Sequence, residues 1–140
     1  MTKISVLGNG SWGSVLGSML ADNGNDVTLY GNIDSVNEEI NKTHTNSHYM
    51  KDWKLNETTK ATGDLEEALD GAELVLFVLP TKAVRIVAKN VRKVLDKTGA
   101  KPLLVTATKG IEPGTKKLIS EILTEEVYPN DEDKIVAISG

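Results

Sequence analysis

This chain contains no cysteine among its 140 residues. Disulfide bonds, thiolate metal sites and a cysteine nucleophile are therefore excluded, and the composition is compatible with a reducing compartment. Long apolar runs are missing as well, since no segment approaches the ~20 residues of a membrane-spanning helix. The apolar run at residues 4–7 meets glycine at once, which is not typical of a secretory signal peptide. We therefore expect no integral membrane segment and a cytoplasmic location.

The chain also lacks an excess of basic residues. Its formal net charge is -4 at pH 7, so the overall charge gives no reason to expect nucleic acid or an anionic membrane as a partner. Hydrophobic residues make up 39% and charged residues 26% of the chain, as in an ordinary soluble protein. At this length roughly two-thirds of the unfolded surface can be buried, and we predict one domain over residues 1–140.

Motifs for metal binding and hydrolytic catalysis are absent. His44 and His48 lie close in the sequence, but no glutamate completes a zinc motif and the segment does not look helical. The loop at residues 110–116 superficially suggests a P-loop but lacks its spacing. No Ser-His-Asp or paired-carboxylate arrangement stands out. The acidic residues at 125–133 are predicted to be a solvated turn, and we predict no metal site.

A G-x-G-x-x-G loop at residues 8–13 is the most informative feature that is present. It lies between an apolar, strand-like segment and a helix-like segment at 11–23. In such loops Gly8 would permit a tight turn, Gly10 would let the backbone approach a pyrophosphate, and Gly13 would let helix and strand pack closely. The helix N-terminus would present free N–H groups and partial positive charge to the phosphates. The pattern predicts dinucleotide binding; the alternative is a glycine turn that binds no dinucleotide.

Strand-like and helix-like segments alternate along the rest of the chain. This alternation predicts an α/β fold of Rossmann type, a doubly wound and mainly parallel sheet with helices on both faces. The nearly continuous apolar run at residues 73–79 is typical of a strand covered on both faces. Residues 43–60 show no convincing period and are predicted to be an irregular excursion over the surface. Strands are predicted at residues 4–7, 26–30, 61–62, 73–79, 102–107 and 134–138, and helices at 11–23, 34–42, 64–69, 82–95 and 116–126.

Caps and apolar faces give finer expectations. Asp34 or Ser35 is expected to cap the helix at 34–42, and Asp64 the helix at 64–69. The helix predicted at 116–126 should direct four apolar side chains inward: Leu118, Ile119, Ile122 and Leu123.

Ligands of an open parallel sheet bind beyond the carboxyl ends of its strands. The residues that directly follow the predicted strands are therefore the candidates for a site. They are the glycine loop and residues 31–32, 80–81, 108–110 and 139–140.

Two of these candidates have side chains of particular interest. Lys109 follows an apolar strand, so its ammonium would face the cleft. There it could bind a substrate phosphate, orient a hydroxyl or touch the nicotinamide end of a cofactor; the alternative is a solvated loop lysine. Trp12, in the first turn of the helix, could wall the cofactor or pack under a neighbouring loop.

An acid about 20 residues after the glycines usually holds the adenosine ribose of NAD. No acid stands at the end of the second predicted strand. Asp34 comes a few residues late, and there is no arginine to bind a 2′-phosphate. Asn32 could hydrogen-bond either form of the ribose, so NAD, NADP or both stay open as the cofactor.

Four segments occur in the order found in bacterial NAD(P)-dependent glycerol-3-phosphate dehydrogenases, and the whole chain resembles that family. They are the G-x-G-S-W-G loop at 8–13, residues 78–81 with Arg85, residues 108–112 and residues 138–140. The resemblance covers only the family's N-terminal cofactor domain. A chain that stops directly after a strand fits a truncation at the edge of that domain, so we expect a C-terminal helical domain outside residues 1–140.

The resemblance implies an oxidoreductase that interconverts sn-glycerol 3-phosphate and dihydroxyacetone phosphate by hydride transfer with NAD or NADP, and that feeds glycerophospholipid synthesis. This small-molecule phosphate substrate would contact Lys109 and Gly140. The general base is expected in the absent domain, so we expect no catalytic residue in this chain and no turnover by it alone. A homodimer is one expectation for the full-length protein. Cofactor contacts are expected from Gly8, Gly10, Ser11, Trp12, Gly13, Asn32, Tyr49, Pro80 and Lys109.

Two other kinds of protein would share the glycine loop. Another two-domain NAD(P) dehydrogenase of hydroxyacid type would lack the pairs Ser11-Trp12 and Lys109-Gly110. A nucleotide-sensing regulatory Rossmann module would use the same fold without chemistry and would not need a lysine at position 109.

Overall fold

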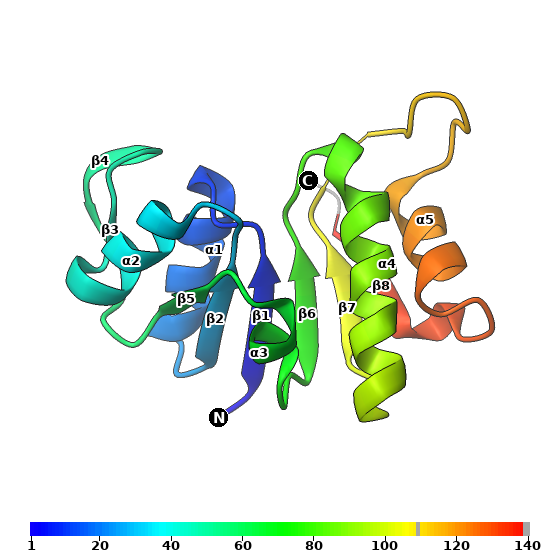
Figure 1. Cartoon of the computed structure of the whole chain (residues 1–140), viewed down its shortest axis with the longest axis horizontal. Helices are drawn as coiled ribbons and strands as arrows, with labels where there is room; N and C mark the ends of the chain where they lie inside the picture. The colour runs from blue at the N-terminus through cyan, green and yellow to red at the C-terminus, as the bar shows by residue number, and fades with distance from the viewer. Residues whose placement is uncertain (109, 139–140) are drawn as a thin grey trace.

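The computed structural model describes residues 1–108 and 110–138 (Figure 1). The predictions for Lys109 and Gly140 fall outside these described residues. Neighbouring strands of the main sheet all pair in parallel. The sheet contains β1 (Lys3–Leu7), β2 (Asp26–Tyr30), β5 (Lys60–Thr62), β6 (Leu74–Phe77), β7 (Leu103–Thr106) and β8 (Ile135–Ala137).

The strand order in this sheet is β5-β2-β1-β6-β7-β8. The chain therefore builds outward from β1 to one edge, returns to β6 at the other side of β1, and builds outward again. This is the doubly wound order of a Rossmann fold, as predicted, and its topological switch point lies between β1 and β6.

Helices cover both faces of the sheet (Figure 1). Successive residues of a strand point to opposite faces. Val6 accordingly packs in one cluster with Ala21 and Ile40, whereas Leu7 packs in the other with Val84. Because both faces are buried, β6 is apolar along its whole length. The helices are α1 (Ser11–Asp22) and α2 (Asp34–Thr43) on one face, and α3 (Leu65–Leu69), α4 (Thr81–Thr98) and α5 (Ile119–Glu126) on the other.

The segment at residues 43–60 is more regular than predicted. It contains an antiparallel pair, β3 (Thr45–Asn46) and β4 (Met50–Lys54). Asn46 is fully buried, and its Nδ2 donates a hydrogen bond of 2.8 Å to the carbonyl oxygen of Asn9. A tertiary contact thus fixes β3, which no periodicity in the sequence could indicate.

Two finer predictions about helix ends are wrong. The residue that caps α2 is Ile33, with no side-chain cap, so neither Asp34 nor Ser35 has that role. Helix α5 begins at Ile119 rather than at residue 116, because Lys116 has a positive φ of 59°. Leu118 is consequently 51% exposed instead of pointing inward.

The predicted cap of α3 is confirmed. The Asp64 side chain accepts hydrogen bonds from the backbone N–H groups of Glu66 and Glu67 at 3.0 and 3.4 Å.

Among the residues that the structure describes, no helix is long and apolar enough to cross a membrane.

Candidate dinucleotide-binding cleft

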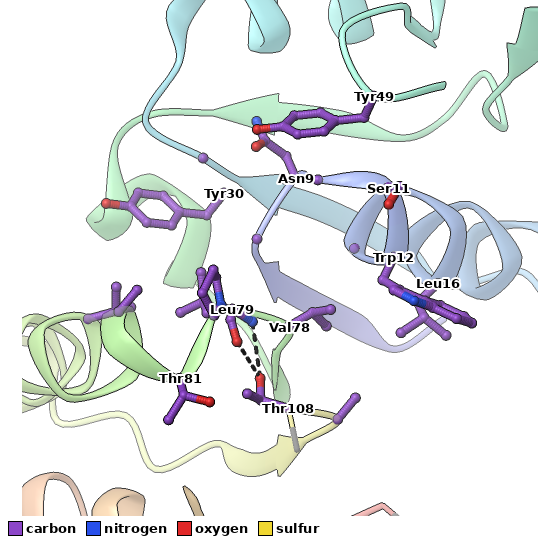
Figure 2. A pocket seen from close by; sticks show the side chains of 18 of the residues that line it. Asn9, Ser11, Trp12, Leu16, Tyr30, Tyr49, Val78, Leu79, Thr81 and Thr108 are labelled. Carbon is purple, nitrogen blue, oxygen red and sulfur yellow. Dashed lines mark hydrogen bonds between the residues drawn. The ribbon is translucent and has the colours of Figure 1, made fainter. Parts of the chain in front are cut away.

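A cleft of about 1120 Å³ lies at the carboxyl edge of the sheet, at the switch point between β1 and β6 (Figure 2). The segments that follow β1, β2, β6, β7 and β8 all contribute to its lining. Of the described lining residues, none carries a formal charge at neutral pH. Attraction for an anionic ligand from this part of the chain must therefore come from backbone dipoles and neutral side-chain donors.

The three glycines of the loop differ in what surrounds them. Gly8 has a positive φ of 126°, and a Cβ there would overlap the carbonyl oxygen of Val78. A Cβ at Gly13 would overlap the carbonyl oxygen of Gly8. At Gly10, by contrast, no atom of the described residues, its chain neighbours aside, lies within 4 Å of where a Cβ would be. The fold itself therefore requires Gly8 and Gly13, whereas the described residues leave open space beside Gly10.

The N-terminus of α1 lies at this open space. Its capping residue, Gly10, provides no side-chain cap, and the first turn contains no acidic residue. The partial positive charge of the helix end is therefore not neutralised by the helix's own side chains. Such an end is a ready-made site for a phosphate group.

Aromatic side chains form part of the lining. Trp12 is 70% exposed and lines the cleft, so it does not pack under a neighbouring loop. Tyr49, between β3 and β4, is 44% exposed and also lines the cleft. Flat, exposed rings at a cleft suit the faces of heterocyclic bases, which stack on them.

Thr108 joins the two loops on the other side of the cleft. Its Oγ1 accepts a hydrogen bond of 3.1 Å from the backbone N–H of Leu79 and lies 2.9 Å from the Leu79 carbonyl oxygen, to which it can donate. Figure 2 shows Leu79 and Thr108 across the opening from Asn9 and Tyr30. The ends of β6 and β7 are thereby held together as one wall.

The comparison with protein families agrees with this geometry. The model of the family described as NAD-dependent glycerol-3-phosphate dehydrogenase N-terminus matches residues 3–140.

The chain belongs to this family.

Curated proteins of this family include relatives with high sequence identity to this chain. A glycerol-3-phosphate dehydrogenase [NAD(P)+] of Lactobacillus helveticus is 96% identical over 140 residues, and one of Streptococcus equi is 49% identical over 138 residues. These alignments cover 100% and 99% of this chain, but only 41% and 40% of the relatives. The chain thus spans about two-fifths of the length of the relatives it matches.

Solved structures of the family have the same fold. Glycerol-3-phosphate dehydrogenase from Coxiella burnetii has a TM-score of 0.85 and 30% identity, over 99% of this chain and 41% of that one. A UDP-glucose dehydrogenase from Pyrobaculum islandicum has a TM-score of 0.67 at 20% identity, over 91% of this chain and 33% of that one, which shows the fold alone. The predicted family is therefore confirmed, ahead of the hydroxyacid-type and regulatory alternatives.

Most residues expected at the family's cofactor site lie together in the cleft. Lys109 and Gly140 fall outside the described residues. Sequence reasoning missed Tyr30, the last residue of β2, whereas Thr108 was among the candidates that follow a predicted strand, and both line the cleft. The predicted residues that line the cleft are Gly8, Gly10, Ser11, Trp12, Gly13, Asn32, Tyr49 and Pro80.

A network of buried asparagines supports the glycine loop from behind. Asn9 Nδ2 donates to Asn37 Oδ1 at 2.7 Å, and Asn37 Nδ2 donates to the carbonyl oxygen of Gly31 at 3.0 Å. Asn46 Nδ2 donates to the carbonyl oxygen of Asn9 and, at 3.0 Å, to Ser14 Oγ. All three asparagines are nearly or fully buried. The network ties α2 and β3 to the loop, and nothing in the sequence pattern pointed to it.

A charged cluster supports the opposite wall. Arg85 donates two hydrogen bonds to the carboxylate of Glu112, at 2.8 and 2.7 Å, and one of 2.5 Å to Glu126. A longer contact of 3.4 Å reaches Glu125. The prediction that these last two glutamates belong to a solvated turn is therefore wrong. They were missed because they lie about 40 residues from Arg85 in the sequence.

The cluster shifts the acidity of its members. Hydrogen bonds from Arg85, and then from Thr115, lower the pKa of Glu112 to about 2. A hydrogen bond from Lys117 lowers the pKa of Glu125. Both carboxylates are therefore ionised at neutral pH, and they anchor the segment that leads away from Gly110. Among the described residues no group of acidic and histidine side chains is placed to hold a metal ion.

Proposed function

We propose that this chain binds NAD or NADP in the cleft and serves as the cofactor domain of an enzyme that reduces dihydroxyacetone phosphate to sn-glycerol 3-phosphate, or the reverse. The observation that carries this proposal is the open space at Gly10 beside the uncapped N-terminus of α1. A pyrophosphate there would accept hydrogen bonds from the first N–H groups of the helix.

The position of the pyrophosphate assigns the two halves of the cofactor. Gly31 and Asn32, which line the cleft at the end of β2, would hold the adenosine half. Pro80 and Thr108, on the other side of the switch point, would hold the nicotinamide half. Hydride transfer is the cofactor's own chemistry, and the residues of this chain orient the ring and exclude water from one side.

The substrate phosphate is proposed to bind through Lys109, with Gly140 beside it. A lysine supplies the positive charge that the described lining lacks. The general base is proposed to lie in a helical domain beyond residue 140. The proposed product, sn-glycerol 3-phosphate, would serve glycerophospholipid synthesis.

The test uses the dehydrogenase that contains this domain, assayed with NADH and dihydroxyacetone phosphate. Lys109→Ala is expected to lower kcat/KM by about a hundredfold or more, because a phosphate loses its charged partner. Lys101→Ala, at an exposed lysine ahead of β7, is the matched control and should leave activity unchanged. Activity of Lys109→Ala near the parental rate would remove the lysine from the mechanism. Turnover by residues 1–140 alone would contradict the placement of the base elsewhere.

A further inference from the structure

The end of β2 lacks the acid that reads the adenosine ribose in many dinucleotide-binding domains. Its last residue is Tyr30, and Gly31 follows. Gly31 does not have a positive φ, so its backbone conformation does not require glycine. A Cβ at this position would instead overlap three atoms of the Asn9 side chain: Cγ, Nδ2 and Oδ1. The Asn9 side chain therefore excludes any other side chain from position 31.

Asn9 is held firmly in this position. It is 6% exposed, its Nδ2 donates to Asn37 Oδ1, and Asn37 in turn donates to the carbonyl oxygen of Gly31. If Asn9 moved aside for a larger residue at 31, the buried Asn37 would lose its hydrogen-bond donor. Leaving a buried polar group unpaired is costly. The hydrogen bonds of Asn9 and Asn37 thus restrict position 31 to glycine.

No other acid takes over the missing role within the described cleft. Asp34 is not among the lining residues, and its carboxylate lies beside Gly63, at 3.6 Å from where a Cβ of that glycine would be. Asn32 lines the cleft, and its side chain is neutral and exposed. An amide can donate to a 2′-phosphate and can accept from a 2′-hydroxyl.

We propose that Asn9 determines the cofactor specificity of this domain by keeping position 31 free of a side chain, so that both NADH and NADPH are accepted at a ribose site read by the neutral Asn32. The inference rests on the proposed function and deepens it. A residue inside the glycine loop thereby acts on the choice of cofactor through position 31. A carboxylate at position 31 would favour the ribose diol and repel a 2′-phosphate, but Asn9 prevents it.

The binding experiment titrates the chain and its variants with NADH and with NADPH by calorimetry. The parent is expected to bind the two with dissociation constants within about tenfold of each other. Gly31→Asp alone should weaken both cofactors, because the new side chain collides with Asn9. The double variant Asn9→Ala, Gly31→Asp should restore NADH binding and shift the ratio toward NADH by about thirtyfold or more. A ratio that stays at the parental value in the double variant overturns the proposal.

A second variant covers the case in which the double variant does not fold. Asn32→Asp is exposed and lies outside the asparagine network, and it should shift the ratio toward NADH by about tenfold or more. An unchanged ratio in this variant also overturns the proposal.

A thermal experiment tests the steric part without any ligand. Gly31→Ala should lower the Tm by about 5 °C or more in the parent, and by less than half of that in an Asn9→Ala background. Gly63→Ala is the matched control, because its Cβ would make only ordinary contacts of 3.4 Å or longer. Equal effects of Gly31→Ala in the two backgrounds overturn the steric exclusion. If the parent binds neither cofactor, the proposed function fails. The thermal experiment still decides whether the Asn9 side chain excludes a larger residue from position 31.

Discussion

The two walls of the cleft are supported by opposite kinds of chemistry. Behind the glycine loop, three buried asparagines form a neutral hydrogen-bond network. Behind the wall of β6 and β7, Arg85 and three glutamates form a charged cluster near the surface. A neutral buried network keeps its strength at any pH and salt concentration, whereas a partly exposed charged cluster does not. The difference predicts which wall is rigid under all conditions and which responds to them.

The largest effect is expected within the glycine loop itself. Gly13→Ala should lower the free energy of unfolding by about 3 kcal/mol or more, because the new Cβ overlaps the carbonyl oxygen of Gly8 and neither backbone can move freely. Gly10→Ala should change it by less than about 1 kcal/mol, since the space beside Gly10 is open. Urea denaturation measures both, and equal losses for the two variants would show that the loop geometry is misjudged.

A smaller effect is expected from the neutral network. Asn37→Ala leaves Asn9 Nδ2 without its acceptor and the Gly31 carbonyl without its donor, so stability should fall by about 2 kcal/mol. The loss should be the same at pH 4 and pH 8 and at low and high salt. Asn90→Ala, at an exposed position of α4, is the control and should stay within about 0.5 kcal/mol of the parent. A loss that varies with salt would mean that charges support this wall too.

The smallest effect is expected from the charged cluster, and it should depend on pH. Arg85→Met removes the guanidinium that lowers the pKa of Glu112 from near 4.5 to about 2. A carboxyl group with a lowered pKa stabilises the folded state above its ordinary pKa, and that contribution disappears as the pH falls toward the lowered value. The variant should therefore be less stable than the parent at pH 7, and the gap should narrow between pH 4.5 and about 2.

Urea midpoints across this pH range measure the gap. Added salt should also reduce it at pH 7, because partly exposed charges are screened. If the difference in stability between the parent and the variant is constant with both pH and salt, Arg85 supports the wall through packing and not through its charge.

Sequence patterns predicted the backbone of the wall that contains the glycine loop, but not the asparagine network that supports it. The tight turn at Gly8, the close packing at Gly13, the strand at Asp26–Tyr30 and the alternation of elements all follow local rules, and these predictions are confirmed. The pairs Asn9–Asn37 and Asn9–Asn46 join residues 28 and 37 positions apart, and no local rule relates such residues.

The same limit applies to the second wall and to the errors at helix ends. Arg85 and Glu112 are 27 residues apart, so the apolar periodicity of the helix predicted at 82–95 could not indicate their contact. Leu118 fits the apolar period of α5, yet an antiparallel bridge between Ile111 and Leu118 keeps it outside the helix. Tertiary contacts decided both cases against the local pattern.

The central claim is that a nicotinamide dinucleotide binds with its pyrophosphate at Gly10 and the N-terminus of α1. Its most direct test is a titration of the chain and of Gly10→Ala with NADH, followed by the quenching of tryptophan fluorescence. Trp12 lines the cleft and reports occupancy, and Trp12→Phe identifies the signal of Trp53. The account predicts saturable binding to the parent and about tenfold or more weaker binding to Gly10→Ala, at unchanged folding stability. Saturable binding of equal strength to both proteins would contradict it.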